Sequence, residues 1–307
     1  MSRFKKAVRE KKKLRLALDG PAGAGKTYTA LRFAAAIGKR IALIDTEHGS
    51  ASLYAGEAPD GIPFEFDTIE LKTHSPAKYT DLIHEAEREG YDVIIIDSWS
   101  HAWSGAGGAL AMVDSAKTKN KFAAWGDVTP VHNEMVEAIL GSPCHVIATL
   151  RTHMEYLVEK DDQGRVTNIT KVGLKPVQRN GVEYEFTVVG DMDIRHQITV
   201  SKTRCKLVDG AIESRPGAKF ILPVVEWLDS GAEPEKATAT ATATVVKRVP
   251  VDEDQVRLFE HLVTGWDENR IAAGLQRYGA KRFEDLDHET ADVILEKISA
   301  QLNGKKV

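Results

Sequence analysis

The chain has 307 residues, 42% hydrophobic and 28% charged, which is the composition of a soluble globular protein longer than one average domain. No apolar run is long enough to cross a bilayer, and two cysteines, Cys144 and Cys205, exclude a disulfide framework and a cysteine-based metal site. A net charge of −4 means that any nucleic-acid contact must come from local basic patches. We therefore expect a protein of a reducing cytoplasm.

The first half of the sequence alternates short apolar strands with helices. Several of the strands are apolar on both faces, which predicts an α/β fold whose mainly parallel sheet is covered by helices on both faces. The helix that follows Ser75 has proline at its first position and ends at Gly90. The predicted strands span 14–19, 40–45, 91–97 and 144–150, and the predicted helices span 26–37, 76–89 and 129–140.

The pattern changes after Arg151. The turn signals DDQG, RNG and VDG predict short strands joined as hairpins. Residues 233–250 read EPEKATATATATVVKRVP, a low-complexity linker. Beyond it, three short amphipathic helices are expected to begin near Asp252, Asp267 and Asp287. The predicted domains are a main α/β domain at 1–232, the linker at 233–250 and a small helical domain at 251–307.

The stretch GPAGAGKT between the first strand and the first helix matches the phosphate-binding pattern G-x-x-x-x-G-K-[ST]. Its glycines allow backbone N–H groups to surround phosphate oxygens, and the helix N-terminus adds a positive dipole end. Lys26 is expected to reach the β- and γ-phosphates, and Thr27 to bind Mg²⁺. The residues predicted to bind ATP here are Gly20, Pro21, Ala22, Gly23, Ala24, Gly25, Lys26, Thr27 and Tyr28.

A second metal ligand is expected at the end of the strand at 91–97. Asp97 follows three isoleucines at the carboxyl end of this strand, where open α/β sheets bind ligands. The alternative is an aspartate that caps a loop. The next residue is Ser98 rather than glutamate, so the catalytic carboxylate must come from elsewhere. Glu47, in the segment IDTEH that ends the second strand, is the best candidate.

At this point the sequence resembles a known family. IDTEH with Tyr54 seven residues after Glu47, followed by Asp97-Ser98, looks like the RecA recombinase core. Together with SPCHVIATLRTHMEY, VGLKPVQRNGVEYEF and SKTRC, the pattern is similar to phage-encoded RecA-like ATPases of the Sak-four group, within the RecA/RadA superfamily, over residues 3–230. The resemblance implies a RecA-like P-loop NTPase core, in which Glu47 activates the attacking water and Tyr54 stacks on adenine. A solvated loop glutamate and a packing tyrosine are the alternatives.

The resemblance also implies residues that sense the nucleotide and that act between subunits. A polar sensor of the γ-phosphate is expected within 149–152, and Arg151 is our choice because the family's glutamine is absent. Lys202 and Arg204, two apart on a strand, are expected to reach a neighbour's γ-phosphate, unless they form a solvated strand face. Phe4 and Ala7 have the F-x-x-A form that docks one protomer on the next. An N-terminal amphipathic helix packed on its own domain is the alternative.

DNA contacts are expected between the metal strand and the following helix, where lysines alternate with aromatic residues. Packing in the core is the alternative for the aromatic residues Phe122 and Trp125. The predicted DNA-binding residues are Lys117, Lys119 and Lys121, with Lys160, Arg165 and Lys171 as alternatives. The module at 251–307 is expected to contact a single-stranded-DNA-binding protein or an annealing protein, and weak contact with DNA is the alternative.

The sequence thus predicts an ATP- and Mg²⁺-dependent ATPase that assembles on single-stranded DNA as a filament or ring. Its expected role is strand annealing or exchange in recombination, in the cytoplasm of a bacterial host and without a membrane partner. A ring-forming helicase or translocase is one alternative. A nucleotide-switched binding module that turns over slowly is another.

Overall fold

The computed structural model describes most of the chain up to residue 233 and part of the segment beyond it. The described residues are 4, 6–117, 121–160, 166–233, 251, 253–264, 266–267, 271–272, 275, 280, 282–286, 291, 294–295 and 298, with only the backbone described at 121–122, 155–160, 166–172 and 253–254. The chain forms two compact units, residues 1–233 and 234–307. All of the predicted linker except Glu233 lies outside the described residues.

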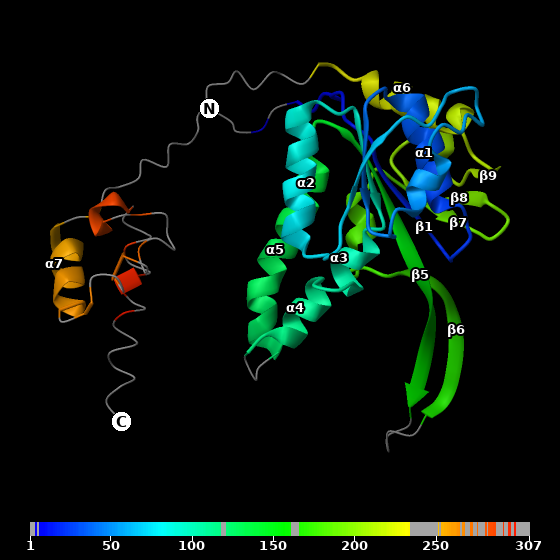
Figure 1. Ribbon diagram of the computed structural model, residues 1–307. Coiled ribbons are helices and arrows are strands. Elements are labelled where there is room, and N and C mark those ends of the chain that lie inside the picture. The colour runs from blue at the N-terminus through cyan, green and yellow to red at the C-terminus, as the bar shows by residue number, and fades with distance from the viewer. Residues whose placement is uncertain are drawn as a thin grey trace. The chain divides into compact units, whose positions relative to one another are not determined.

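The first unit alternates helices and strands along the chain (Figure 1). The strands are β1 (Arg15–Gly20), β2 (Ile41–Asp45), β3 (Asp67–Glu70), β4 (Val93–Asp97), β5 (His145–Lys160), β6 (Val166–Pro176), β7 (Val188–Met192), β8 (Gln197–Thr203) and β9 (Ile212–Ser214). The helices are α1 (Lys26–Ile37), α2 (Pro76–Glu89), α3 (Ser100–Ser104), α4 (Ala109–Ser115), α5 (Lys121–Gly141) and α6 (Ala218–Asp229). Short 3₁₀ helices are η1 (Ser50–Tyr54), η2 (Val182–Glu185) and η3 (Lys206–Val208).

The strands form one mainly parallel sheet, as the sequence predicts. Within the described residues its order is β3-β2-β4-β5-β1-β7-β8-β9, and β6 pairs with β5 alone. The six neighbours β3, β2, β4, β5, β1 and β7 run parallel. Strands β8 and β9 continue the sheet in antiparallel pairing. Because β1, β4 and β5 are neighbours in the middle of the sheet, their carboxyl ends come together at one edge.

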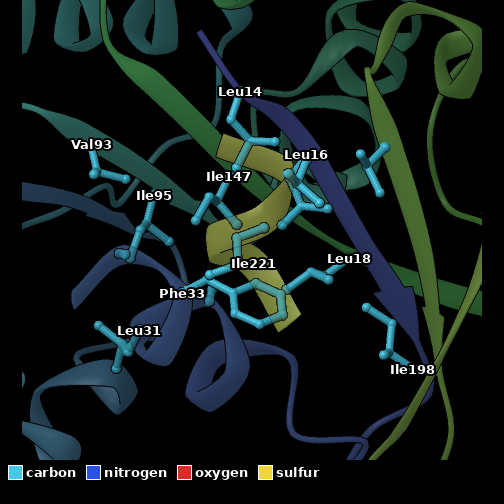
Figure 2. Close-up of a cluster of buried hydrophobic side chains, with 14 of the residues drawn as sticks. Leu14, Leu16, Leu18, Leu31, Phe33, Val93, Ile95, Ile147, Ile198 and Ile221 are labelled. Carbon is cyan, nitrogen blue, oxygen red and sulfur yellow. The ribbon is translucent and has the colours of Figure 1, made fainter. Parts of the chain in front are cut away.

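Both faces of the sheet are covered by helices, which explains why its strands are apolar at successive positions. Leu16 and Leu18 of β1 pack in a cluster with residues of α1 and α6, whereas Ala17 between them packs on the opposite face, in a cluster with residues of α2 and α5. Ile147 of β5 joins the first cluster, and its neighbour Val146 joins the second. Figure 2 shows Leu16, Leu18 and Ile147 converging with Phe33 of α1. The alternation of side chains in a strand therefore builds two cores.

The last parallel strand before the hairpins is longer than the sequence predicts. A strand was expected to end at residue 150, but β5 continues to Lys160 and pairs with β6 in antiparallel register, from Thr152 opposite Pro176 to Lys160 opposite Val166. The predicted turn DDQG falls between these two strands in the sequence and lies outside the described residues. The resulting β5–β6 hairpin projects from the sheet (Figure 1).

Other element predictions also need correction. The helix expected to begin at residue 129 begins at Lys121, so that Pro130 lies inside α5. The sequence predicts neither strand β3 nor helices α3, α4 and α6. The alternative of an N-terminal amphipathic helix packed on the domain is wrong for the described residues, because 6–9 form no helix and Phe4 is 95% exposed.

The second unit has its own apolar cluster. Its described elements are α7 (Glu253–Leu262) and a 3₁₀ helix, η4 (Phe283–Asp285). The rings of Phe259 and Phe283 stack with centroids 4.2 Å apart, and Leu275 and Leu295 belong to the same cluster. The helices expected to begin near Asp267 and Asp287 lie mostly outside the described residues. Across the described part of the whole chain, we find no helix with the length and apolar character needed to cross a membrane.

Candidate nucleotide site

The glycine-rich loop joins β1 to α1 and depends on glycine at particular positions. Gly20 has a φ of 152°, and a Cβ there would collide with the carbonyl oxygen of Met192. Gly25 has a φ of 85°, and a Cβ there would lie 2.9 Å from Nδ1 of His196. Neither position tolerates a side chain in this conformation. The loop therefore brings its backbone, rather than side chains, to the N-terminus of α1.

Lys26 begins α1 and lies against the loop. Its ammonium donates hydrogen bonds to the carbonyl oxygens of Gly20 and Pro21, each at 2.9 Å. Burial lowers the pKa of Lys26, and the nearby carboxylates of Asp97 and Glu47 oppose this shift. The side chain expected to contact phosphates is thus a partly desolvated cation, which binds an anion more strongly than an exposed lysine does.

Asp97 lies at the carboxyl end of β4, where two threonines hold its carboxylate. The Thr27 hydroxyl donates to Oδ2 at 2.6 Å, and the Thr149 hydroxyl at the same end of β5 donates to Oδ1. Asp97 is 3% exposed, and burial raises its pKa. The two predicted metal ligands, the Thr27 hydroxyl and the Asp97 carboxylate, are therefore in direct contact, as a shared metal site requires.

Glu47 and Arg151 form an ion pair at the same edge of the sheet. Glu47 follows β2, and Oε1 of its side chain accepts hydrogen bonds from Nε of Arg151 at 3.0 Å and from Nη2 at 2.9 Å. Both side chains are partly exposed, so the pair contributes at most about 1 kcal/mol to stability. The candidate base, just after β2, and the candidate sensor, within β5, thus lie more than a hundred residues apart in the sequence and contact each other directly.

Two tyrosines lie beside the loop. The rings of Tyr28 and Tyr54 pack edge to face with centroids 5.2 Å apart, and Tyr28 also packs against Phe64. The Tyr28 hydroxyl donates to Glu57 at 2.9 Å. Tyr54 packs against the core through α1 and still lines the cavity described next, so packing and ligand contact are compatible roles for it.

These groups surround one cavity of about 910 Å³. This volume is in the range of pockets that bind small molecules and cofactors. Most of the predicted site residues line it. The lining residues are Ala22, Gly23, Gly25, Lys26, Thr27, Tyr28, Thr29, Arg32, Glu47, Tyr54, Pro59, Asp97, Arg151, Thr152, His196 and Arg215.

Lys202 and Arg204 do not line this cavity. They lie where β8 pairs with the start of β7, near the amino ends of the parallel strands. The Lys202 ammonium donates to the carbonyl oxygens of Tyr184, at 3.0 Å, and of Phe186, and Nη2 of Arg204 lies 3.4 Å from the same Tyr184 oxygen. Lys202 lies on β8, whereas Arg204 follows its last residue, Thr203, and both side chains contact backbone carbonyls of their own chain.

Of the predicted DNA-binding residues, the structure describes the side chain of Lys117, which does not line this cavity. Lys117 is exposed after α4, whereas Lys119 lies outside the described residues and the side chain of Lys121 is not described. Arg165 also lies outside, and the side chains of Lys160 and Lys171 are likewise not described. Trp125 stacks on Trp103 in a small cluster between α3, α4 and α5, in agreement with the packing alternative for this ring.

Several residues that the sequence did not suggest complete the site. His196, in the turn between β7 and β8, has Nδ1 3.2 Å from the Ala24 carbonyl oxygen. Arg215, after β9, donates its backbone N–H to the His196 carbonyl at 2.7 Å. Their φ values of 61° and 49° lie in the left-handed region, which non-glycine residues occupy rarely and mainly where function requires it. No motif marks them, because an antiparallel turn brings them to the P-loop.

Two further polar groups lie just behind the cavity. Asp19 is 7% exposed, and burial together with Asp191 on the adjacent strand raises its pKa to about 7, although Lys26 opposes the shift. On the other side, the Thr46 hydroxyl lies 2.6 Å from Nδ1 of His101. Burial lowers the pKa of His101, so this ring is neutral near pH 7.

Comparison with known proteins agrees with this geometry. A family model described as an AAA domain matches residues 12–211, well over half of the chain, and the chain therefore belongs to this family. The mainly parallel α/β sheet and the glycine-rich loop are those of a P-loop NTPase, and this class of protein binds a nucleotide at such a loop. No curated protein matches the sequence.

Proposed function

We propose that this P-loop protein hydrolyses ATP with Mg²⁺ and couples hydrolysis to single-stranded DNA in recombination, promoting strand annealing or exchange. The observation that carries the proposal is the convergence of Lys26, Glu47, Asp97 and Arg151 on one cavity. A phosphate-binding cation, a metal carboxylate, a carboxylate able to accept a proton and a second cation are the groups that phosphoryl transfer to water requires.

The residues present fit a magnesium ion. Thr27 and Asp97 offer two hard oxygen ligands in contact with each other, and Mg²⁺ in nucleotide sites combines one or two such ligands with phosphate oxygens and water. When bound, the ion supplies charge neutralisation to the β- and γ-phosphates. Among the described residues no group of three or more His, Cys, Asp or Glu side chains could hold a metal by itself, which favours a metal that arrives with nucleotide.

The chain's own residues have distinct roles in this proposal. Lys26 exchanges the carbonyls of Gly20 and Pro21 for phosphate oxygens. Glu47 accepts the proton of the attacking water. Arg151 holds the Glu47 carboxylate through two hydrogen bonds and is drawn towards the γ-phosphate when ATP binds. While Arg151 donates both hydrogen bonds to Oε1 of Glu47, that oxygen is not free to bind the attacking water, so this exchange would limit hydrolysis without a correctly placed nucleotide.

The resemblance to RecA-like ATPases of the Sak-four group supports the recombination role. β5, the strand that follows the metal strand in the sequence, lies directly beside β4. It carries Thr149 to Asp97 and Arg151 to Glu47 before it continues into a hairpin. A strand that contacts both the metal carboxylate and the base is suited to transmit the state of the nucleotide. We place this activity in the cytoplasm of a bacterial host, with the second unit contacting a DNA-binding or annealing partner.

The test is the rate of ATP hydrolysis with and without single-stranded DNA, with electron microscopy of the same samples. The proposal expects stimulation by DNA and assemblies that form on it. Closed rings that unwind a forked duplex would favour a helicase or translocase instead. Tight ATP binding with no stimulation by DNA would favour a nucleotide-switched binding module.

Self-assembly has its own test. Phe4 of the F-x-x-A pattern is almost fully exposed, which leaves its ring accessible to another protomer. If Lys202 and Arg204 act on a neighbour's ATP, Arg204→Ala should reduce DNA-stimulated hydrolysis without weakening ATP binding. A mixture with Lys26→Ala, which lacks a working site but keeps the basic pair, should recover part of the activity. Failure to complement, with both variants folded and co-assembled, would exclude action between subunits.

A further inference from the structure

A second hollow of about 610 Å³ lies at the base of the β5–β6 hairpin and shares no lining residue with the nucleotide cavity. Its walls come from α3, the start of α4, both strands of the hairpin and the segment that follows β6. We propose that this hairpin-base groove binds single-stranded DNA, with Trp103 stacking on a base and with Lys175 and Arg179 contacting phosphates. The inference rests on the proposed function and names the site at which DNA would act.

Trp103 supplies a rigid aromatic surface in the groove. One contact of its ring is the stacked ring of Trp125, with centroids 5.4 Å apart and planes 25° apart, and a second is the edge of His132 at 5.5 Å. Trp103 remains partly exposed and lines the groove. Since its neighbours already fix the ring, Trp103 loses little additional side-chain freedom when a base stacks on it.

The charges in the groove are positive. His153 and Lys175 are directly opposite each other on the hairpin, so their side chains point to the same face. Arg179 donates from Nη1 to the amide oxygen of Asn133 at 2.8 Å, a neutral partner that orients the guanidinium without neutralising it. Among the residues that the structure describes in the lining of this groove, none is Asp or Glu. In a chain with net charge −4, such a local concentration of cations is what phosphate binding requires.

Hydrogen bonds connect the groove to the nucleotide cavity. The backbone N–H of Val177 donates to the carbonyl of Arg151 at 2.7 Å. Gln178, which is 6% exposed, donates to the carbonyl of Trp99 at 3.2 Å and accepts from the backbone N–H of Arg179 at 2.9 Å. Trp99 follows Asp97 by two residues. A change in Arg151 on ATP binding therefore acts on the segment that carries Arg179, and coupling of the two ligands is reciprocal.

The combination of an aromatic surface and cations selects a single strand. In a duplex the base faces are stacked inside the helix, whereas in a single strand they are open to an aromatic ring. The expected ligand is thus a short stretch of single-stranded DNA, with little dependence on base sequence because every base offers a flat face.

The test uses the full-length protein and fluorescence anisotropy of a labelled oligothymidylate, with and without a non-hydrolysable ATP analogue and Mg²⁺. We expect the double variant Lys175→Ala with Arg179→Ala to bind roughly tenfold more weakly. Its log K against log[salt] slope should be shallower by about 1.4, which corresponds to two phosphate contacts on a single strand. The matched control, Lys39→Ala with Lys206→Ala, removes two exposed lysines outside the groove and should bind as the wild type does.

Variants of the aromatic surface give a second measurement. Trp103→Phe keeps a ring and should retain most of the affinity, whereas Trp103→Ala should lose roughly 5- to 100-fold, the range for one stacked base. Circular dichroism and ATP hydrolysis without DNA show whether Trp103→Ala is folded. If it is not folded, the double variant decides, because Lys175 and Arg179 lie outside the apolar clusters.

The outcomes separate this inference from the proposed function. If the wild type binds single-stranded DNA and the double variant binds as the control does, the groove is not the site and the proposed function stands. If the wild type binds no DNA in any nucleotide state, the proposed function fails together with the groove. Equal loss of duplex and single-strand binding in the double variant would overturn the preference for a single strand.

Discussion

Buried polar and charged side chains lie at both ends of the central parallel strands, but the two ends use them differently. At the carboxyl end, Lys26 and Asp97 face a cavity of about 910 Å³. At the amino end, the Arg15 guanidinium, on a side chain only 6% exposed, is surrounded by the chain's own backbone. It donates hydrogen bonds to the carbonyl oxygens of Leu14, Leu140, Ser142 and Cys144.

The comparison teaches that a shifted pKa marks burial and does not by itself mark a functional site. Burial lowers the pKa of Arg15 to about 10 and that of His145 to about 4, and both are used in folding, since His145 accepts the backbone N–H of Leu14 at 3.1 Å. Burial also raises the pKa of Asp19 to about 7 at the opposite end. The carboxyl end differs because its groups face open space that a ligand can fill.

The largest expected effect is at the carboxyl end. Lys26→Ala should abolish ATP hydrolysis and weaken nucleotide binding, because the loop loses the cation that lies against its backbone. Phosphate release from ATP and binding of a fluorescent ATP analogue measure the two effects. Wild-type turnover in this variant would show that the cavity is not a hydrolytic site.

Removing the base candidate should act on turnover alone. Glu47→Gln should keep ATP bound while the rate of hydrolysis falls roughly 10²-fold or more, in the range for a positioned general base. Glu85→Gln, an exposed glutamate of α2, is the matched control. Equal rates of hydrolysis in the two variants would show that Glu47 is not the general base.

A substitution at the amino end should have the opposite profile. Arg15→Met leaves several buried carbonyl oxygens without a donor, so the free energy of unfolding should fall by roughly 2–5 kcal/mol. The rate of ATP hydrolysis per folded molecule should stay near that of the wild type. Urea denaturation and the ATPase assay check the two halves of the prediction, with the exposed Arg88→Met as control. A loss of hydrolysis without a loss of stability would contradict the prediction that Arg15, at the amino end of the strands, acts in folding and not in hydrolysis.

The raised pKa of Asp19 predicts that the free energy of unfolding depends on pH. The folded protein binds the Asp19 proton more tightly than the unfolded chain does, so this group's contribution to stability is greatest below about pH 4 and is lost as pH rises to about 7. Asp19→Asn should therefore raise the free energy of unfolding at pH 8 by on the order of a few kcal/mol. Below pH 4 it should change stability little. Urea denaturation at both pH values is the measurement, and an equal effect at both would contradict it.

The sequence predicted most of the sheet because local signals and tertiary packing agree there. β1, β2 and β4 are short and apolar, and each ends at glycine or aspartate. Helix α2 begins at Pro76 and ends before Gly90, as predicted. The start of α5 could not be predicted in this way. Thr129 and Pro130 favour a helix start, but contacts of Ala124 and Val128 with α4 continue the helix towards Lys121.

The site shows the same division. The P-loop and Glu47 follow strands and Asp97 ends one, so their meeting at one edge follows from the parallel order of the sheet. His196 and Arg215 reach the cavity only because β8 and β9 turn back along β7, and no local pattern specifies that path. The ion pair of Arg151 with Glu47 likewise depends on which strands become neighbours.

The unbroken course of β5 has a mechanical consequence. The strand runs from the buried Thr149 through Arg151 and then continues to Lys160 as one strand of the β5–β6 hairpin, a further length of roughly 30 Å at ~3.3 Å per residue. In a long hairpin, a small rotation at the base moves the far end through a larger distance. A rotation of about 5° at the γ-phosphate end, smaller than many side-chain adjustments, sweeps the far end through about 3 Å, which is close to the width of a hydrogen bond. Fluorophores at Glu159 and on the body of the first unit would register that swing as a change in energy transfer when ATP is added.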